Sequence, residues 1–288
     1  MSLKDRIKNL AGGDANKAQI LLRVYMMERF LERLSRSRYR DNFVLKGGVL
    51  VSSLVGIEYR TTMDIDSTIR SLTLDQENAK RIIEEIARIP LEDGVSFEIQ
   101  SEENIMEDLD YPGIRFVLIG RVGNMRQPIK IDLSTGDPMT PSAIEFPYRL
   151  MLEERSIGLL SYNLETLLAE KLETAISRGK ANTRMRDFYD IHMLYTQKSE
   201  KIDLEMLALA FLATCGHRGT LFLATSAKKT LESVAEDKAM EMAWRRFQRS
   251  IRFAEGLTWE EVNKTVHQLW SLMEKKLPFP EEGKVEKS

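Results

Sequence analysis

The chain has 288 residues, 43% of them hydrophobic, which is enough for one large domain or two ordinary domains, each with its own core. Lys and Arg number 42 against 44 for Asp and Glu, so the net charge of −2 excludes an overall attraction to nucleic acid or to an anionic membrane, and a polyanion must meet a local patch. The chain has one cysteine, Cys215, and it shows neither an apolar signal segment nor an apolar run long enough to cross a bilayer. We therefore predict a cytoplasmic protein without a membrane partner.

The first predicted element is a helix over residues 17–34. Its apolar side chains recur at intervals of three and four residues, which places them on one side of a helix. These side chains are Ile20, Val24, Met27, Leu31 and Leu34. We therefore expect residues 1–37 to form an N-terminal helical segment that packs on the domain after it.

A mixed α/β pattern follows over residues 38–145. Short runs rich in β-branched and aromatic residues alternate with turn residues and predict strands, and one run with helical spacing lies among them. The strand-like runs are FVL, MDIDSTI, VSFEIQ, IRFVLIGRV and PIKIDLS, and the helical run is ENAKRIIEEIARI. This range therefore predicts one α/β core.

The rest of the chain has a helical pattern. After the proline-containing stretch DPMTPSAIEFP, nearly every segment has helical spacing, from NLETLLAEKLETAI to EEVNKTVHQLWSLMEKK. We predict a helical domain over residues 146–278 and a disordered polar tail over 279–288. The fold class is therefore α+β, a mixed sheet with flanking helices followed by a helical C-terminal domain.

Asp64 and Asp66 stand one residue apart in the strand-like run RTTMDIDSTIR. Alternate side chains of a strand share a face, so both carboxylates point into one space while Ile65 points into the core. Their mutual repulsion raises their pKa values unless a cation lies between them, and Mg²⁺ is the usual cation for clustered carboxylates. The alternative is a solvated polar face on an edge strand, because so short a motif also occurs by chance.

Lys46, Gly47 and Gly48 precede this strand, where FVL runs into a predicted helix, VLVSSLVG. A double glycine at a helix start exposes backbone N–H groups, which suit a phosphate group. A tight turn between a strand and a helix is the alternative.

A third aspartate, Asp132, lies in the strand-like run PIKIDLS. Lys130 and Asp132 share one face of this strand, opposite Ile129 and Ile131. If the strand pairs beside the one that carries Asp64 and Asp66, three carboxylates converge. Three carboxylates can hold the pair of Mg²⁺ ions that activates a hydroxyl and stabilises a leaving pyrophosphate.

These motifs also carry a family resemblance. Gly-Gly, a helix, a strand with Asp-x-Asp and a later aspartate on a neighbouring strand resemble the DNA polymerase β-type nucleotidyltransferase fold. The longer motif, KGG followed by R-x-T-x-DID, resembles that of the AbiEii/AbiGii-type nucleotidyltransferase toxins of type IV toxin–antitoxin and abortive-infection systems. Gly-Gly stands where the wider superfamily has Gly-Ser, which puts a hydroxyl contact to phosphate in doubt unless Thr62 supplies one.

The resemblance implies roles for the first half of the chain. Asp64, Asp66 and Asp132 are the expected metal ligands and catalytic residues, with Mg²⁺ or Mn²⁺ as cofactor and a nucleoside triphosphate as substrate. The expected nucleotide-binding residues of this half are Lys46, Gly47, Gly48, Arg60 and Thr62.

The second half contains a lysine within an apolar helical stripe. Lys171 shares one face of the helix over 164–176 with leucines, and it either extends to the surface or enters a cleft. On the next helix Asp187 and Asp190 stand three residues apart, where an ion pair or a helix cap is the structural alternative. LLAEKLETAISR followed by RDFYDIHML resembles the second signature of the same family. By that resemblance Lys171 is catalytic and holds the triphosphate, and at least one of the two aspartates faces the nucleotide.

Basic side chains gather at two further places, in SRGKANTRMR and in WRRFQRSIRF. Most such stripes are ordinary solvated faces, but an RNA substrate needs patches of this kind to neutralise its phosphates. The candidate RNA contacts are Arg178, Arg184, Arg245 and Arg249.

We therefore predict a Mg-dependent nucleotidyltransferase, a toxin that transfers a nucleotide to an acceptor hydroxyl. The resemblance implies an RNA acceptor, such as the 3′ end of tRNA, and a cognate antitoxin from the same operon that need not contact the toxin. A small-molecule nucleotidyltransferase of the antibiotic-modifying type is one alternative. A nucleotide-binding partner protein without turnover is another, although the three aspartates argue against it.

Overall fold

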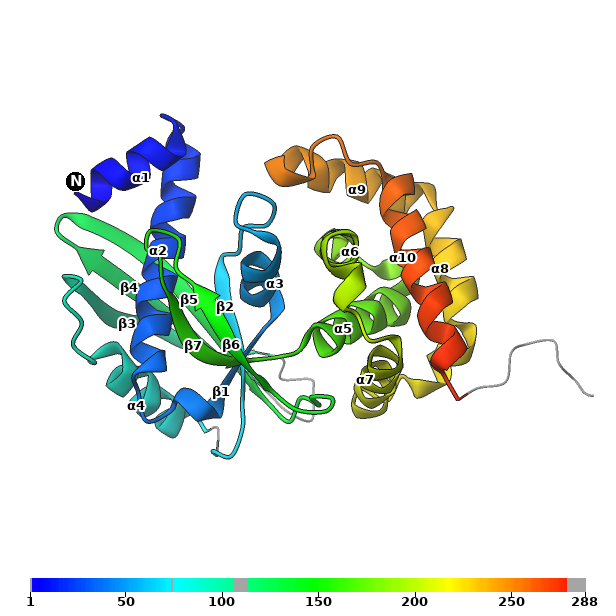
Figure 1. Ribbon diagram of the computed structural model, residues 1–288, viewed down its shortest axis with the longest axis horizontal. Coiled ribbons are helices and arrows are strands. Elements are labelled where there is room, and N and C mark those ends of the chain that lie inside the picture. Colours follow the sequence, from blue (N-terminus) through cyan, green and yellow to red (C-terminus); the bar gives the residue numbers. More distant parts are fainter. Residues whose placement is uncertain (1, 74, 106–112, 279–288) are drawn as a thin grey trace, which may run out of the picture. The chain divides into compact units, whose positions relative to one another are not determined.

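The structure, a computed structural model, describes residues 2–73, 75–105 and 113–278. The chain divides into two compact units, each described by itself (Figure 1). The sheet unit comprises Met1–Asp137 and Ala143–Ser161, and the helical unit comprises Pro138–Ser142 and Tyr162–Ser288.

The sheet unit is built on one mixed sheet, which has seven strands in the described part of the chain, in the order β3-β4-β5-β2-β1-β7-β6. β2 pairs in parallel with β5 and β1 with β7, while the other neighbours are antiparallel. The strands are β1 (Phe43–Lys46), β2 (Asp64–Ile69), β3 (Val95–Ile105), β4 (Gly113–Val122), β5 (Met125–Thr135), β6 (Ile144–Arg149) and β7 (Ser156–Ser161).

One face of this sheet is covered by helices, and the apolar core lies between them and the sheet. Helices α2 (Ala15–Ser35) and α4 (Gln76–Ala87) pack on it, and α1 (Leu3–Ala11) packs on α2. Ile65, Phe116 and Ile131 point into this core and are at most 1% exposed. Since side chains alternate along a strand, the residues between them lie on the opposite face, which carries the charged groups discussed below.

Local hydrogen bonds account for where the helices begin. Asp14 caps α2 by accepting a hydrogen bond from the N–H of Lys17, and Asp75 caps α4 in the same way. Helix α3 (Gly47–Val55) begins directly after β1 without a side-chain cap, and it contacts β1 and β2. Its first residues therefore keep backbone N–H groups for partners outside the helix.

The helical unit consists of packed α-helices joined by short connections. α5 contacts α6 and α7, and α10 packs on α6, α7, α8 and α9 (Figure 1). Thr258 and Glu261 form a capping box at the start of α10, and aromatic rings in tilted or edge-to-face contact, including those of Trp244 and Trp259, fill the interior. The helices are α5 (Leu164–Arg178), α6 (Met185–Lys198), α7 (Leu204–His217), α8 (Ala227–Ala235), α9 (Lys238–Ser250) and α10 (Trp259–Met273).

The predicted elements of the first half are confirmed, with a helix on residues 17–34 and strands on the strand-like runs. The sheet continues past residue 145, however, so the first part of the range 146–278 is not helical: β6 and β7 lie in the sheet unit, and the helical unit begins at Tyr162. β6 reads IEFPYR, where a proline and two charged residues hide the strand pattern. The predicted tail, 279–288, lies outside the described residues.

Candidate active site

The charged face of the sheet carries both aspartates of the Asp-x-Asp motif. Ile65 between them is buried in the core, so Asp64 and Asp66 share the opposite face, as predicted. β5 is the parallel neighbour of β2, which is the pairing that convergence of the three carboxylates requires. Asp132 is thereby placed directly opposite Asp66.

Four charged residues form a row across this face, which we call the charged row. Arg115 of β4 stands opposite Asp132 of β5, Asp132 opposite Asp66 of β2, and Asp66 opposite Lys46 of β1. Side chains at partnered positions share a face and stand close together. Two adjacent carboxylates are thus flanked by one cation on each side.

Asp66 is held by the turn at Gly47 and Gly48, which we call the glycine turn. Its Oδ2 accepts a hydrogen bond of 3.0 Å from the backbone N–H of Gly48. Gly47 has a φ of +56°, and a Cβ atom there would lie 2.3 Å from the same Oδ2, so only glycine lets the carboxylate approach. Burial, and then the charges of Asp132 and Asp64, raise the pKa of Asp66 to about 6 against the opposing N–H of Gly48.

Asp132 is held by Arg115. The guanidinium donates from Nε to Oδ1 at 2.8 Å and from Nη2 to Oδ2 at 2.7 Å, a bidentate pair. This pair raises the pKa of Arg115 above its usual range. Sequence reasoning missed Arg115 because it stands alone in the apolar strand IRFVLIGRV, and only the register between strands shows what lies opposite.

The other predicted contacts of this unit lie around the glycine turn. Lys46 Nζ is 2.7 Å from Oδ2 of Asp137, whose pKa is lowered by this lysine and by Ser134 although burial opposes the shift. Arg60 and Thr62 are buried beside Gly48, where a Cβ atom would lie 2.8 Å from Thr62 Oγ1. The predicted nucleotide contacts are thus close together in the fold, although their roles remain predictions.

The chemistry of this face fits a divalent cation. Asp64 and Asp66 offer carboxylate oxygens, the ligands that Mg²⁺ prefers. Burial raises the pKa of Asp66 most, and the charges of Asp132 and Asp64 add a repulsion that a cation would relieve. Within residues 2–73, 75–105 and 113–278, no three Asp, Glu, His or Cys side chains are close enough together to hold one ion. Asp66 is drawn toward Gly48 and Asp132 toward Arg115, in opposite directions across the sheet. The assignment of all three aspartates as ligands remains a prediction.

In the helical unit, Lys171 does not extend to the surface. Its Nζ lies 2.7 Å from Oδ2 of Asp190 and 3.1 Å from Oδ1 of Asp187, which joins α5 to α6. The Asp190 side chain is fully buried, and this lysine stabilises its charge. Oδ2 of Asp187 is buried and accepts no hydrogen bond from the described residues. Lys171 therefore forms an ion pair with both aspartates of the RDxxD segment, a contact that the sequence did not predict and that is at least structural.

The candidate RNA contacts are exposed. Arg178 ends α5, Arg184 precedes α6, and both Arg245 and Arg249 lie on α9. Arg245 pairs with Glu241 at 2.5 Å, so part of its charge is already neutralised.

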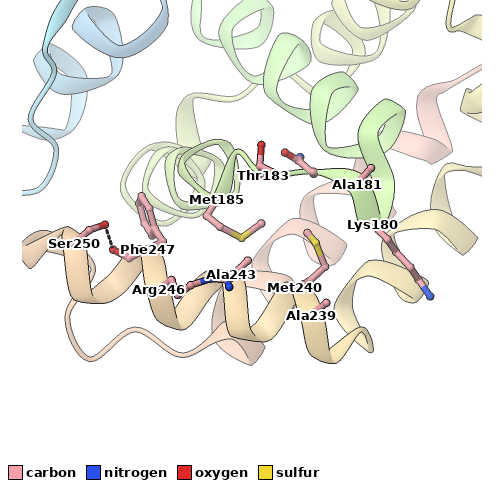
Figure 2. Close-up of a pocket in the computed structure, with 11 residues that line it drawn as sticks. Lys180, Ala181, Thr183, Met185, Ala239, Met240, Ala243, Arg246, Phe247 and Ser250 are labelled. Carbon is pink, nitrogen blue, oxygen red and sulfur yellow. Dashed lines mark hydrogen bonds between the residues drawn. The ribbon is translucent and has the colours of Figure 1, made fainter.

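A cavity of about 590 Å³ lies in the same unit, between the start of α6 and α9 (Figure 2). Met185 and Met240 face one another across it, Arg246 and Phe247 line it from α9, and the Lys180 side chain points away. Sequence reasoning did not single out Arg246, because its neighbour Arg245 fits the basic stripe better.

No helix in the described part of the chain combines the length and the apolar character that crossing a membrane requires. No curated protein matches the sequence.

Two solved structures share the fold over 90% of this chain. The crystal structure of JHP933 from Helicobacter pylori has a TM-score of 0.55 and 17% identity over 93% of its own length. A second H. pylori protein, provisionally described as a nucleotidyltransferase, has a TM-score of 0.54 and 16% identity over 96% of its length. They support the predicted fold class, a mixed sheet with flanking helices followed by a helical C-terminal region.

One protein family matches the sequence of this chain. The family described as nucleotidyl transferase AbiEii toxin, type IV toxin–antitoxin system, matches residues 29–269, which include the glycine turn, the charged row and the ion pairs of Lys171. This match covers most of the chain and confirms the predicted resemblance. The chain is a nucleotidyltransferase and belongs to the AbiEii toxin family of type IV toxin–antitoxin systems.

Proposed function

We propose that this toxin transfers a nucleotide, in the presence of Mg²⁺ or Mn²⁺, from a nucleoside triphosphate to a hydroxyl of RNA, such as the 3′ end of tRNA. The observation that carries the proposal is the charged row beside the glycine turn. It places Asp66 opposite Asp132 on the same face as Asp64, and it places the N–H of Gly48 at the carboxylate of Asp66.

Several residues of the sheet unit have separate proposed roles in this reaction. The hydroxyl oxygen of the acceptor forms a bond to the α-phosphorus, the bond from that phosphorus to the bridging oxygen breaks, and pyrophosphate leaves. Asp132 lies at the acceptor side and takes the hydroxyl proton. Asp64 and Asp66 are the residues that would hold the divalent cation, which neutralises charge on the phosphates when bound. Lys46 and the turn at Gly47 lie where the phosphates are proposed to bind.

The second signature has a proposed role as well. Lys171 is expected to contact the triphosphate, and Asp187, with one buried oxygen that accepts no hydrogen bond from the described residues, is the better candidate of the two aspartates for a nucleotide contact. Asp190 is fully buried behind the lysine and is expected to hold it in place.

An RNA acceptor is supported by the cavity in the helical unit. Its described lining includes Arg246, the ring of Phe247 and no acidic residue. Its size, about 590 Å³, lies within the range of about 300–1,000 Å³ typical of small-ligand pockets, and an aromatic ring beside a guanidinium suits a base and its phosphate. The exposed arginines Arg178, Arg184, Arg245 and Arg249 are the proposed backbone contacts. As a type IV toxin, the chain has a cognate antitoxin, which we propose acts without needing to contact it.

The test is transfer from each α-labelled triphosphate, with Mg²⁺ or with EDTA, to total RNA, purified tRNA or an aminoglycoside. We expect label only on RNA, only with metal, and none with Asp64→Asn. Label on the small acceptor alone would favour the antibiotic-modifying alternative. Triphosphate binding without label on any acceptor would favour a binding protein without turnover.

A further inference from the structure

The bidentate pair between Arg115 and Asp132 occupies both oxygens of the carboxylate that is proposed to work at the acceptor side. The two hydrogen bonds are 2.8 Å and 2.7 Å long and are charge-assisted, which makes them among the stronger contacts a carboxylate forms. A carboxylate in this state is neutralised by a cation that belongs to the protein.

The strand register makes this contact oppose the neighbouring one. β4 lies on the far side of β5 from β2, so Arg115 draws Asp132 away from Asp66. Gly48, which follows β1 on the other side of β2, holds Asp66 in the opposite direction. The two carboxylates at partnered positions are therefore kept apart by donors at the two ends of the row.

Arg115 has a second acidic neighbour that can keep it paired. Glu103 of β3 stands opposite Arg115 in the register, and its Oε1 lies 3.5 Å from Nη1. The Arg115 side chain is 30% exposed, so moving it needs no rearrangement of the core. The guanidinium can leave Asp132 and remain beside Glu103 without becoming an unpaired buried charge.

We propose that Arg115 is an internal counter-cation, which a divalent metal ion must displace from Asp132 before that carboxylate joins Asp64 and Asp66. Arg115 is then a positioning residue that weakens metal binding by the nucleotide-free enzyme. This inference rests on the metal site proposed for Asp64 and Asp66. It adds that the site is completed by an exchange of cations at Asp132.

The exchange predicts that removing the arginine strengthens metal binding. Arg115→Ala deletes a positive charge next to the carboxylates and frees both oxygens of Asp132. The Kd for Mn²⁺ should fall by about tenfold or more, the scale expected for a unit charge a few ångströms away at a partly exposed site. A residue with only a structural role would leave this Kd unchanged or raise it.

The experiment measures Mn²⁺ binding to the full-length chain without nucleotide, by calorimetry and by the loss of the free Mn²⁺ electron paramagnetic resonance signal. Arg121→Ala is the matched control, because Arg121 lies on the same strand and face and pairs with an exposed glutamate, Glu98. The double variant Arg115→Ala/Asp132→Asn tests whether the gain acts through Asp132, and in that variant the gain should disappear. Arg115→Met, which keeps the aliphatic stem, replaces Arg115→Ala if the melting temperature shows that the alanine variant does not fold.

The outcomes separate this inference from the proposed function. Tighter binding in Arg115→Ala, but not in Arg121→Ala or the double variant, supports the exchange, even where the parent itself binds Mn²⁺ too weakly to measure. Equal Kd values in the parent and Arg115→Ala overturn the exchange and leave the metal site intact, as does a gain that persists without Asp132. Absence of Mn²⁺ binding in all variants, with or without a non-hydrolysable triphosphate, overturns both.

Discussion

Lys171 on α5 and Asp190 on α6 form a nearly buried ion pair, with 2.7 Å between Nζ and Oδ2 and side-chain exposures of 9% and 0%. The same ammonium also lies within ion-pair distance of Asp187, so Lys171 contacts both aspartates of the RDxxD segment. Removing Asp190 leaves the nearly buried ammonium of Lys171 with less compensating charge, although Asp187 stays within 3.1 Å of it.

We therefore expect Asp190→Asn to lower the free energy of unfolding by about 1–3 kcal/mol, the cost of removing one partner from a buried hydrogen-bonded group. Urea unfolding followed by circular dichroism measures this. Glu241→Gln is the control, since its partner Arg245 is exposed on α9, and it should cost no more than about 0.5 kcal/mol. Equal unfolding midpoints for Asp190→Asn and the parent would show that Lys171 does not depend on Asp190.

Asp187→Asn should behave differently, because Asp187 is partly exposed and one of its oxygens accepts no hydrogen bond from the described residues. We expect a smaller loss of stability than in Asp190→Asn and a clear change in triphosphate affinity, measured by calorimetry on the folded variant. A large loss of stability with unchanged affinity would assign Asp187 a structural role as well.

The sequence predicted the charged face because alternation along a strand is a local property. Ile65 had to point into the core, so Asp64 and Asp66 had to share the other face, and the same logic placed Asp132. Arg115 could not be found in this way, because its partner is seventeen positions away along the chain and depends on the register between β4 and β5.

Two other features depend on non-local contacts. β6 and β7 have weak strand patterns, and their place at the edge of the sheet follows from the pairing of β7 with β1. The apolar stripe around Lys171 left open whether the lysine reached solvent or a partner, and the answer depends on how α6 packs on α5. Helical spacing predicts which side of a helix is buried, but it does not predict what lies opposite.

The glycine turn gives the next prediction. Gly47→Ala should place a methyl group within 2.3 Å of Asp66 Oδ2, so the carboxylate must move and transfer should fall by about 10², as expected for a displacement of the reacting groups by about 1 Å. Gly123→Ala is the matched control, because Gly123 has nearly the same φ, +53°, and no atom within 4 Å of the added carbon. Both variants carry the same backbone strain, so the control should lose stability but keep its transfer rate. Equal transfer rates for the two variants would mean that Asp66 does not need its observed position.

Glu28 predicts how stability depends on pH. It is buried on α2 beside Arg29, Glu32 and Glu153, and it accepts a hydrogen bond of 2.8 Å from the N–H of Met151. Burial above all raises its pKa from 4.5 to about 8. Between these values the folded protein keeps a proton that the unfolded chain has released, so the free energy of unfolding should fall as pH rises, by at most about 1.4 kcal/mol per pH unit from this group.

Glu28→Gln removes the titration but keeps an oxygen that can accept from Met151. Urea unfolding between about pH 5 and pH 8 should therefore show a flatter dependence for Glu28→Gln than for the parent. Some slope should remain, because the pKa of Asp66 is raised as well. Glu84→Gln, at a partly exposed glutamate of α4 that pairs with Arg88, is the control and should keep the parent's slope. An unchanged slope in Glu28→Gln would mean that Glu28 is ionised in the folded protein.

Arg246 provides the test of the RNA acceptor, because it is exposed on α9 and lines the cavity together with Met185 and Phe247. Arg246→Glu should weaken tRNA binding, and the slope of log K against log salt should fall by about 0.7 for each single-strand phosphate contact that is lost. Triphosphate affinity should not change. Arg88→Glu is the control, since Arg88 is an exposed arginine that directly follows α4, and it should leave both the tRNA affinity and the slope at the parent's values. Fluorescence anisotropy with labelled tRNA over a salt series measures both quantities. A parental slope in Arg246→Glu, with a parental slope in Arg184→Glu and Arg249→Glu as well, would show that the helical unit does not bind the RNA backbone through these arginines.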